Sequence, residues 1–141
     1  MLKNEKGMTL MEIMIVIAIM GGLMALLVPN LMNTYTKAKV KQSEIQLNNL
    51  KNALRTYLID CGNYPTSDAG LAALTSDPGS DVCRSWGPSP YIDKHQLRDQ
   101  FGHEFEYESD GQKLVLTFLG KDGRKGGKDF NRDIEVEEGA E

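Results

Sequence analysis

The sequence has few of the residues that catalytic sites use most. Its 141 residues include two histidines, two cysteines and one tryptophan, and aromatic residues make up 7%. Neither His95 nor His103 stands at triad spacing from a serine, cysteine or carboxylate, and the glycines of 120–127 do not match a phosphate-binding loop. The sequence therefore predicts no enzyme, and both histidines are expected to be surface or loop residues.

A strong charge of one sign is also lacking. The formal net charge is -4, and most charged residues lie after position 36. The densest basic cluster, Lys37, Lys39 and Lys41, is short and has no aromatic residues among its lysines, which is typical of a solvated helix face. We therefore expect no nucleic-acid partner.

One apolar run, from Met8 to Val28, fills most of the N-terminal region. It is long enough to cross a bilayer as a helix. A secretory signal would have an apolar core of about 7 to 15 residues followed by a small-residue cleavage site, and this run is longer and lacks such a site. We expect it to stay on the protein as a transmembrane helix in contact with lipid. Lysines on both sides of the run leave its orientation open.

Glu12 is the only ionisable residue inside this run. An acid at the centre of a membrane helix costs about 2.5 to 3.5 kcal/mol on insertion scales and is usually paired and functional. Glu12 lies near the start of the run, so its side chain could instead reach the lipid headgroups. Position alone leaves both interpretations open.

The two cysteines, Cys61 and Cys83, flank a segment rich in Gly, Pro, Ser and Asp. If this part of the chain is exported, the oxidising compartment favours a disulfide, whereas free thiols are expected in the cytosol. A metal site is disfavoured because two thiols without a nearby histidine offer too few ligands. A disulfide would in turn favour an exported C-terminal part.

The pattern stays helical from Asn30 to Asp60 but becomes amphipathic, and Gly62 provides a helix stop. The apolar positions recur at steps of three and four and are Leu47, Leu50, Leu54, Tyr57 and Leu58. One continuous helix of about 50 residues is predicted, which far exceeds ordinary globular lengths.

Residues 63–100 are expected to form an ordered connecting loop with one short helix over Asp68 to Leu74. Glu104 to Glu108 and Lys113 to Leu119 are predicted to form a hairpin, and Ile134 to Val136 a third short strand. The predicted fold is α+β, with the long N-terminal helix packed on a small antiparallel sheet of two or three strands.

The string from Gly7 to Glu12, "GMTLME", follows a short lysine-containing leader. It resembles the prepilin motif of type IV pilins and of the related pseudopilins of type II secretion. The resemblance implies a leader peptide over 1–7, a transmembrane and assembly helix over 8–29, and an amphipathic helix with a periplasmic globular head over 30–141.

The same resemblance assigns roles to single residues. A prepilin peptidase would cut between Gly7 and Met8, and Met8 would then be N-methylated. The family's assembly glutamate falls on Glu12 and its helix-kinking proline on Pro29. In low dielectric the new amine of one subunit would attract Glu12 of its neighbour, so assembly would relieve the burial of an unpaired acid.

Further segments resemble, in order, the head of the major pseudopilin of the type II secretion system. They are "GNYPTSDAGLAAL", "WGPSPYI", "LRDQFGHEFEY" and "GKDGRKGGKDFNRDI". The chain departs from the family at Gln100-Phe101-Gly102, where Pro-Trp-Gly is usual, and in its paired cysteines. The implied fold is that of the type IV pilins.

The stretch from Gly120 to Asp133 is rich in glycine and in oxygen-bearing side chains. Spacing alone is compatible with a solvated polar turn, since Ile134 and Ala140 stand where an EF-hand needs Gly and Glu. The resemblance implies a structural calcium ion. Its expected ligands are the side chains of Asp122 and Asp129, the backbone near Leu119 and Ile134, and Asn131 or Asp133 in place of a family acid that falls on Phe130.

The resemblance implies a non-enzymatic subunit of a filament that extends from the Gram-negative inner membrane and drives export of periplasmic proteins. Its expected partners are further copies of itself as a helical homopolymer, minor pseudopilins, the inner-membrane assembly platform, the prepilin peptidase and lipid. Two alternatives remain open: a major type IV pilin for adhesion, motility or DNA uptake, and a membrane-tethered binding module that never polymerises.

Overall fold

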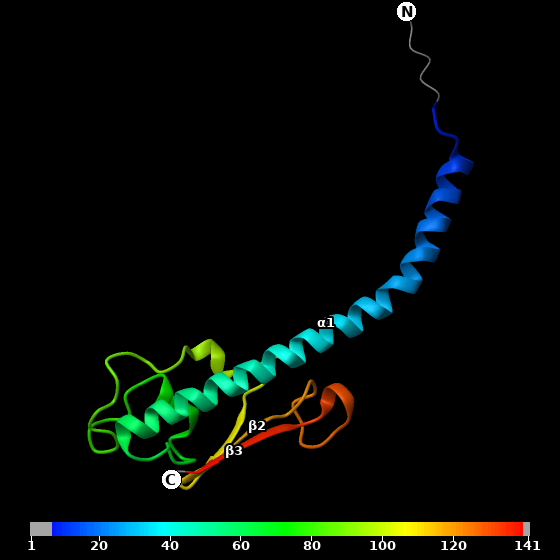
Figure 1. Cartoon of the computed structure of the whole chain (residues 1–141). Coiled ribbons are helices and arrows are strands. Elements are labelled where there is room, and N and C mark those ends of the chain that lie inside the picture. Colours follow the sequence, from blue (N-terminus) through cyan, green and yellow to red (C-terminus); the bar gives the residue numbers. More distant parts are fainter. Residues whose placement is uncertain (1–6, 140–141) are drawn as a thin grey trace, which may run out of the picture. The chain divides into compact units, whose positions relative to one another are not determined.

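The structure, a computed structural model, describes residues 7–139. The predicted leader lies outside this range except for Gly7. The elements follow in the order α1 (Leu10–Cys61), η1 (Gly70–Leu74), η2 (Lys94–Leu97), β1 (Glu106–Ser109), β2 (Lys113–Phe118), η3 (Asp129–Asn131) and β3 (Ile134–Gly139) (Figure 1). The chain divides into two compact units, one ending at Thr36 and the other beginning at Lys37.

The first unit consists mainly of the N-terminal part of α1. The helix begins at Leu10 and is assigned without a break through Gly21, Gly22 and Pro29. An 18-residue window of it has a mean hydropathy of 2.5, and none of that window is buried. By length and composition this part of α1 can therefore cross a membrane.

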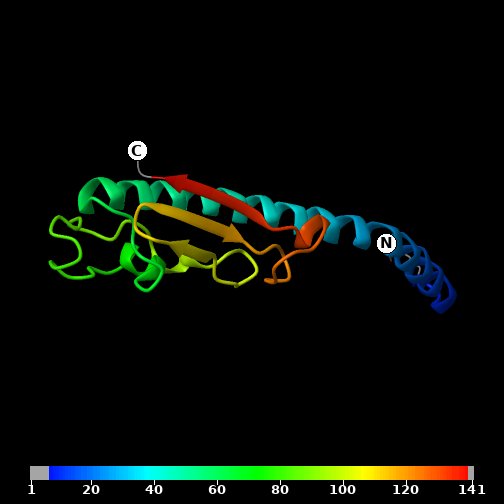
Figure 2. The same ribbon diagram turned by 90° about the horizontal axis from the view of Figure 1, so that it is seen from below.

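The second unit is the head, in which the C-terminal part of α1 packs on a three-stranded sheet of order β1-β2-β3 (Figures 1 and 2). Both strand pairs are antiparallel, with Leu116 opposite Tyr107 on one side and Val136 on the other. Side chains alternate across a sheet, so Leu114, Leu116 and Phe118 all point to the face that covers the helix. All three are buried.

The core of the head lies between this sheet face and one side of α1. Leu47, Leu50, Leu54 and Tyr57 are buried, as the apolar periodicity predicts, whereas Leu58 is half-buried. The connecting loop packs against the same core through the edge-to-face ring pairs of Tyr91 with Tyr57 and Trp86.

The disulfide between Cys61 and Cys83 is present, and its two Cα atoms lie 4.8 Å apart. It attaches the loop to the last residue of α1. Gly62 follows with a φ of 85° and donates its amide to the carbonyl of Leu58, so the predicted helix stop is confirmed. The Tyr91 hydroxyl also donates to the Asp60 carboxylate at 2.8 Å, which adds a second attachment beside the disulfide.

Most of the predicted elements are confirmed with small shifts. The single long helix has 52 residues. The hairpin and the third strand form, although β1 begins two residues later than predicted and β3 extends to Gly139. The short helix predicted over Asp68 to Leu74 is a 3-10 helix limited to Gly70–Leu74. The two other 3-10 helices, η2 and η3, were not predicted.

Removing the disulfide should destabilise the head. The two cysteines are 22 residues apart, and a cross-link of this span stabilises by roughly 3 kcal/mol in the chain-entropy model. We expect Cys61→Ser combined with Cys83→Ser to lower the unfolding free energy of the head by about this amount, measured by urea denaturation. Unfolding curves that coincide for the variant and the oxidised native chain would contradict this. The native chain under reductant is the matched control and should resemble the variant.

Candidate assembly and cation sites

The N-terminal motif lies at the start of α1. Gly7, Met8 and Thr9 precede the helix and are exposed, and Glu12 stands in its first turn. The Thr9 amide donates to Glu12 Oε2 at 3.5 Å, and the Glu12 amide donates to Thr9 Oγ1 at 3.3 Å. This reciprocal pair is a capping box, which satisfies two of the amides that a helix start leaves free.

The capping box gives Glu12 a contact within its own chain that the sequence interpretation missed. The signal was present, because Thr9 and Glu12 form the Thr-x-x-Glu pattern just ahead of an apolar run. Apart from Thr9, no polar contact to the Glu12 side chain is found among residues 7–139. The carboxylate can therefore accept a further donor without losing its place in the helix.

The residues of the predicted cation site occupy the loop between β2 and β3. Leu119 directly follows β2 and Ile134 opens β3, where Ile134 lies opposite Phe118. The two predicted backbone positions are thus close together at one end of the sheet. Asp129 and Asn131 belong to η3, the short 3-10 helix inside the loop.

Two glycines allow the loop to close on itself. A Cβ atom at Gly120 would lie 2.5 Å from the carbonyl oxygen of Asn131, and one at Gly127 would lie at the same distance from that atom. The Lys121 amide also donates to the carbonyl of Phe130 at 2.8 Å. These contacts hold the backbone of η3 against the end of β2.

Asp133 is the carboxylate that best matches a cation ligand. Its Oδ2 accepts the Gly126 amide at 2.7 Å, whereas its Oδ1 is buried and has no hydrogen-bond partner among the described residues. A buried carboxylate oxygen without a partner is costly. A hard cation such as calcium, which binds carboxylate, amide and carbonyl oxygens, would relieve that cost.

Asp122 and Asp129, the other acids of the loop, have no buried side-chain oxygen without a partner. Asp122 Oδ1 accepts the Arg124 amide at 3.3 Å, and Asp129 has a left-handed backbone with a φ of 54°. Residues 7–139 contain no group of three or more His, Cys, Asp and Glu side chains arranged for a metal. The donor set around Asp133 therefore fits calcium only if Asn131 and backbone carbonyls supply part of the coordination.

Two neighbouring side chains support the loop from outside. A Cβ at Gly123 would lie 2.7 Å from the ring of His103, so the loop backbone rests directly on this imidazole. The buried Asp99 carboxylate accepts the amides of Phe101 and His103 at 2.8 and 2.9 Å. His103 is thus a packing residue beneath the loop, in keeping with the loop position predicted for it.

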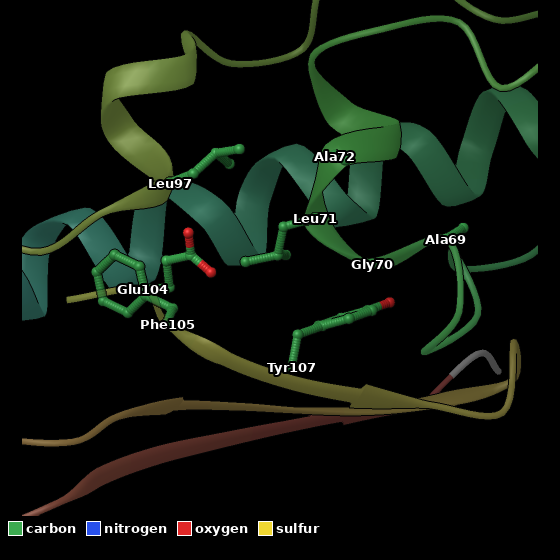
Figure 3. A pocket seen from close by; sticks show the side chains of 8 residues that line it. All are labelled: Ala69, Gly70, Leu71, Ala72, Leu97, Glu104, Phe105 and Tyr107. Atoms are coloured by element: carbon green, nitrogen blue, oxygen red, sulfur yellow. The ribbon is translucent and has the colours of Figure 1, made fainter. Parts of the chain in front are cut away.

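Elsewhere in the head, a hollow of about 360 Å³ lies between η1, η2 and β1 (Figure 3). It is lined mainly by apolar residues, and Glu104 is the charged residue among them. Tyr107 donates its hydroxyl to the carbonyl of Pro65 at 2.6 Å, and burial raises the pKa of Tyr107 to about 12. This tyrosine therefore acts as a neutral structural donor beside the hollow.

Two family models match the chain. The first, described as type II secretion system (T2SS), protein G, matches residues 30–137, and the second, described as prokaryotic N-terminal methylation motif, matches residues 2–28. The first match covers most of the head, and the second covers the apolar run and the motif around Gly7.

Individual proteins agree with these matches. The type II secretion system core proteins G of Vibrio cholerae and Pseudomonas aeruginosa are each 36% identical over 135 residues, which covers 94% of this chain and 92% and 94% of theirs. The crystal structure of the major pseudopilin from the type 2 secretion system of enterohaemorrhagic Escherichia coli is similar with a TM-score of 0.58 and 29% identity. It covers 76% of this chain and 93% of that chain.

The closure of the loop can be tested with two glycines that differ only in their surroundings. Gly120→Ala places a methyl group against the backbone of Asn131, whereas Gly126→Ala meets nothing within 4 Å; both have positive φ. Gly126→Ala should cost about 1 to 2 kcal/mol from backbone strain alone. Gly120→Ala should cost more, because the clash adds to the same strain. Equal losses in thermal unfolding of the two variants would show that the loop does not close as described.

Proposed function

The chain belongs to the type II secretion system protein G family, and we propose that its work in the cell is to polymerise from the inner membrane into a short filament that drives export of periplasmic proteins. It is a pseudopilin with a long N-terminal helix, a three-stranded antiparallel sheet and a membrane anchor. The proposal rests on one observation: the same chain contains both the protein G head and the N-terminal motif with Gly7 and Glu12.

The proposed assembly step depends on Glu12. A prepilin peptidase would cut after Gly7 and leave an amine on Met8, which would then be methylated. The capping box holds the Glu12 carboxylate at the first turn of α1 and leaves it able to accept another donor. A neighbouring copy would provide that donor through its Met8 amine, because opposite charges attract strongly in a medium of low dielectric. Pro29 and the glycines before it would let the helix adjust as copies pack.

We also propose that the loop from Leu119 to Ile134 holds a structural calcium ion. The unpartnered Oδ1 of Asp133 supports this, as do Asp122, Asp129 and Asn131 in the same loop. The bound ion would neutralise the carboxylates and fix the loop, and it would take no part in chemistry on a substrate. Asp133 replaces the acid that Phe130 cannot supply.

The remaining expectations follow from this function. The head would stand in the periplasm, where the disulfide can form and persist. The chain would act without catalysis of its own, as a substrate of the prepilin peptidase. Its partners would be further copies of itself, minor pseudopilins and the inner-membrane assembly platform. A long adhesive type IV pilus is disfavoured because the head matches the protein G family.

Replacing Glu12 should impair filament assembly without preventing insertion of the chain in the membrane. Glu12→Ala removes the carboxylate that a neighbour's amine would meet, so we expect a chain that inserts in the membrane but gives at least tenfold fewer filaments. Filaments are counted by electron microscopy of cells that overproduce the chain. Glu12→Gln is the matched control that separates the charge from the helix cap. Its amide oxygen can still accept the Thr9 amide, whereas the negative charge is lost. Normal filament yield from Glu12→Ala would contradict the proposed assembly step.

Calcium binding should raise the melting temperature of the head. We expect a chelator to lower the melting temperature of the head, because a ligand bound only by the folded state stabilises it. Asp133→Asn should abolish most of this response, whereas Asp68→Asn, at an exposed position outside the loop, should retain it. A melting temperature that is unchanged by chelator in the native chain would rule out the site.

A further inference from the structure

The outer edge of β1 is closed by other backbone at both of its ends and is open between them. At one end the Ser67 amide donates to the carbonyl of Ser109 at 3.1 Å, and the Ser109 amide donates to Ser67 Oγ at 2.8 Å. At the other end Arg98 and Glu104 form an antiparallel bridge. Within residues 7–139, the stretch 105–108 has no backbone hydrogen bond on this side. A strand rises about 3.3 Å per residue, so the open stretch is about 13 Å long.

Tyr107 directs its backbone amide and carbonyl out of this open stretch. In an antiparallel pair, successive residues of a strand turn their backbone groups alternately toward and away from the partner strand. The Asp110 amide donates to the carbonyl of Lys113 at 3.3 Å, so Tyr107, three positions earlier, turns its groups away from β2. Ser109 agrees with this alternation, because its amide and carbonyl are directed to Ser67. One donor and one acceptor therefore face outward at Tyr107.

These two groups face the hollow of about 360 Å³ between η1, η2 and β1 (Figure 3). Its walls include Leu71 of η1, Leu97 of η2 and Phe105 beside Tyr107. A volume of this size is at the lower end of the range for ligand sites. An extended peptide has the matching shape, because one of its residues can exchange both hydrogen bonds with Tyr107. The side chain of that residue would point to the same face as Tyr107, between the apolar walls.

The walls of the hollow are held in place by the head itself. The Tyr107 hydroxyl donates to the carbonyl of Pro65 at 2.6 Å. The side-chain amide of Gln46 donates to the carbonyls of the residues before and after Leu97. A peptide would therefore meet a surface that is already formed, which lowers the cost of ordering on binding.

We propose that the hollow binds an extended, uncharged segment of another protein. The segment adds to the open edge of β1 as a fourth strand of about four residues, the length of the open stretch. Its backbone pairs with Tyr107, and one apolar side chain lies against Leu71 and Leu97. A charged side chain is excluded from this position because burial against apolar walls is costly. The inference goes beyond the proposed function and does not depend on polymerisation.

A second copy of the chain does not offer such a segment from its sheet. Within residues 7–139 the other free strand edge is that of β3, which pairs with β2 alone. Ile134 and Val136 of β3 pack against the core of their own head. The remaining side chains of β3 before Gly139 are glutamates. No apolar side chain of this strand is thus available to enter the hollow of a neighbour.

Hydrogen exchange of the Tyr107 amide tests the inference in the full chain, isotope-labelled for NMR and held in detergent micelles. The probe is the neutral peptide acetyl-Thr-Leu-Thr-Thr-amide, whose leucine would pair with Tyr107. For a dissociation constant of about 1 mM, which suits so small a contact, about 5 mM peptide should slow exchange of the Tyr107 amide about sixfold. The matched control peptide contains N-methyl-leucine. It keeps the apolar side chain but cannot donate to the Tyr107 carbonyl, so it should protect little.

A substitution at the rim of the hollow provides the second readout. Ala72 is exposed and lines the hollow, so Ala72→Phe should fill it, remove the protection and leave the melting temperature nearly unchanged. Gln112→Phe, at an exposed position on the β1-β2 turn, is the control and should bind the peptide normally.

Three results would each overturn the inference: equal protection by the two peptides, protection only at amides other than Tyr107, or no protection at all. If Ala72→Phe unfolds, the comparison of the two peptides on the native chain decides alone. Filament formation is not measured in this experiment, so the proposed function stands or falls separately.

Discussion

The buried side of α1 in the head is the surface on which the other elements are built. Leu47, Leu50, Leu54 and Tyr57 are almost fully removed from solvent by the sheet and the connecting loop. None of these elements could bury its apolar residues alone, because a three-stranded sheet and a loop of this length have no second layer of their own. The helix supplies that layer, and the same helix continues into the apolar segment that anchors the chain. Fold and anchor therefore depend on one uninterrupted element.

Much of this arrangement could be predicted from the sequence because it depends on periodicity. The steps of three and four from Leu47 to Tyr57 locate the buried side of the helix, and alternation in residues 113–118 locates the buried side of β2. The disulfide could be predicted once export was assumed. The 3-10 helices η2 and η3 could not, because each is held by contacts outside its own turn. The side-chain amide of Gln46 donates to the carbonyls of Gln96 and Arg98 at η2, and the Lys121 amide donates to the carbonyl of Phe130 in η3.

The candidate sites, too, could be predicted from the sequence only in part. Gly7, Met8 and Glu12 were identified by spacing, yet the capping role of Thr9 was missed although its pattern is local. In the loop, the family resemblance indicated Asp122 and Asp129 as side-chain ligands and left Asn131 or Asp133 as a replacement. Only the fold distinguishes Asp133, whose buried Oδ1 lacks a partner, from Asp122, which accepts a nearby amide. Gly120 and Gly127 let the loop backbone approach Asn131 closely, and neither that approach nor the burial of Asp133 Oδ1 can be inferred from residue order.

Glu138 connects the last strand to the helix through Arg55 and Lys51. Lys51 and Arg55 are four residues apart and therefore lie on the same side of α1. β3 is an edge strand that hydrogen-bonds to β2 alone. The carboxylate of Glu138 thus attaches this edge strand directly to the helix, so that β3 is held from two sides although only one strand pairs with it.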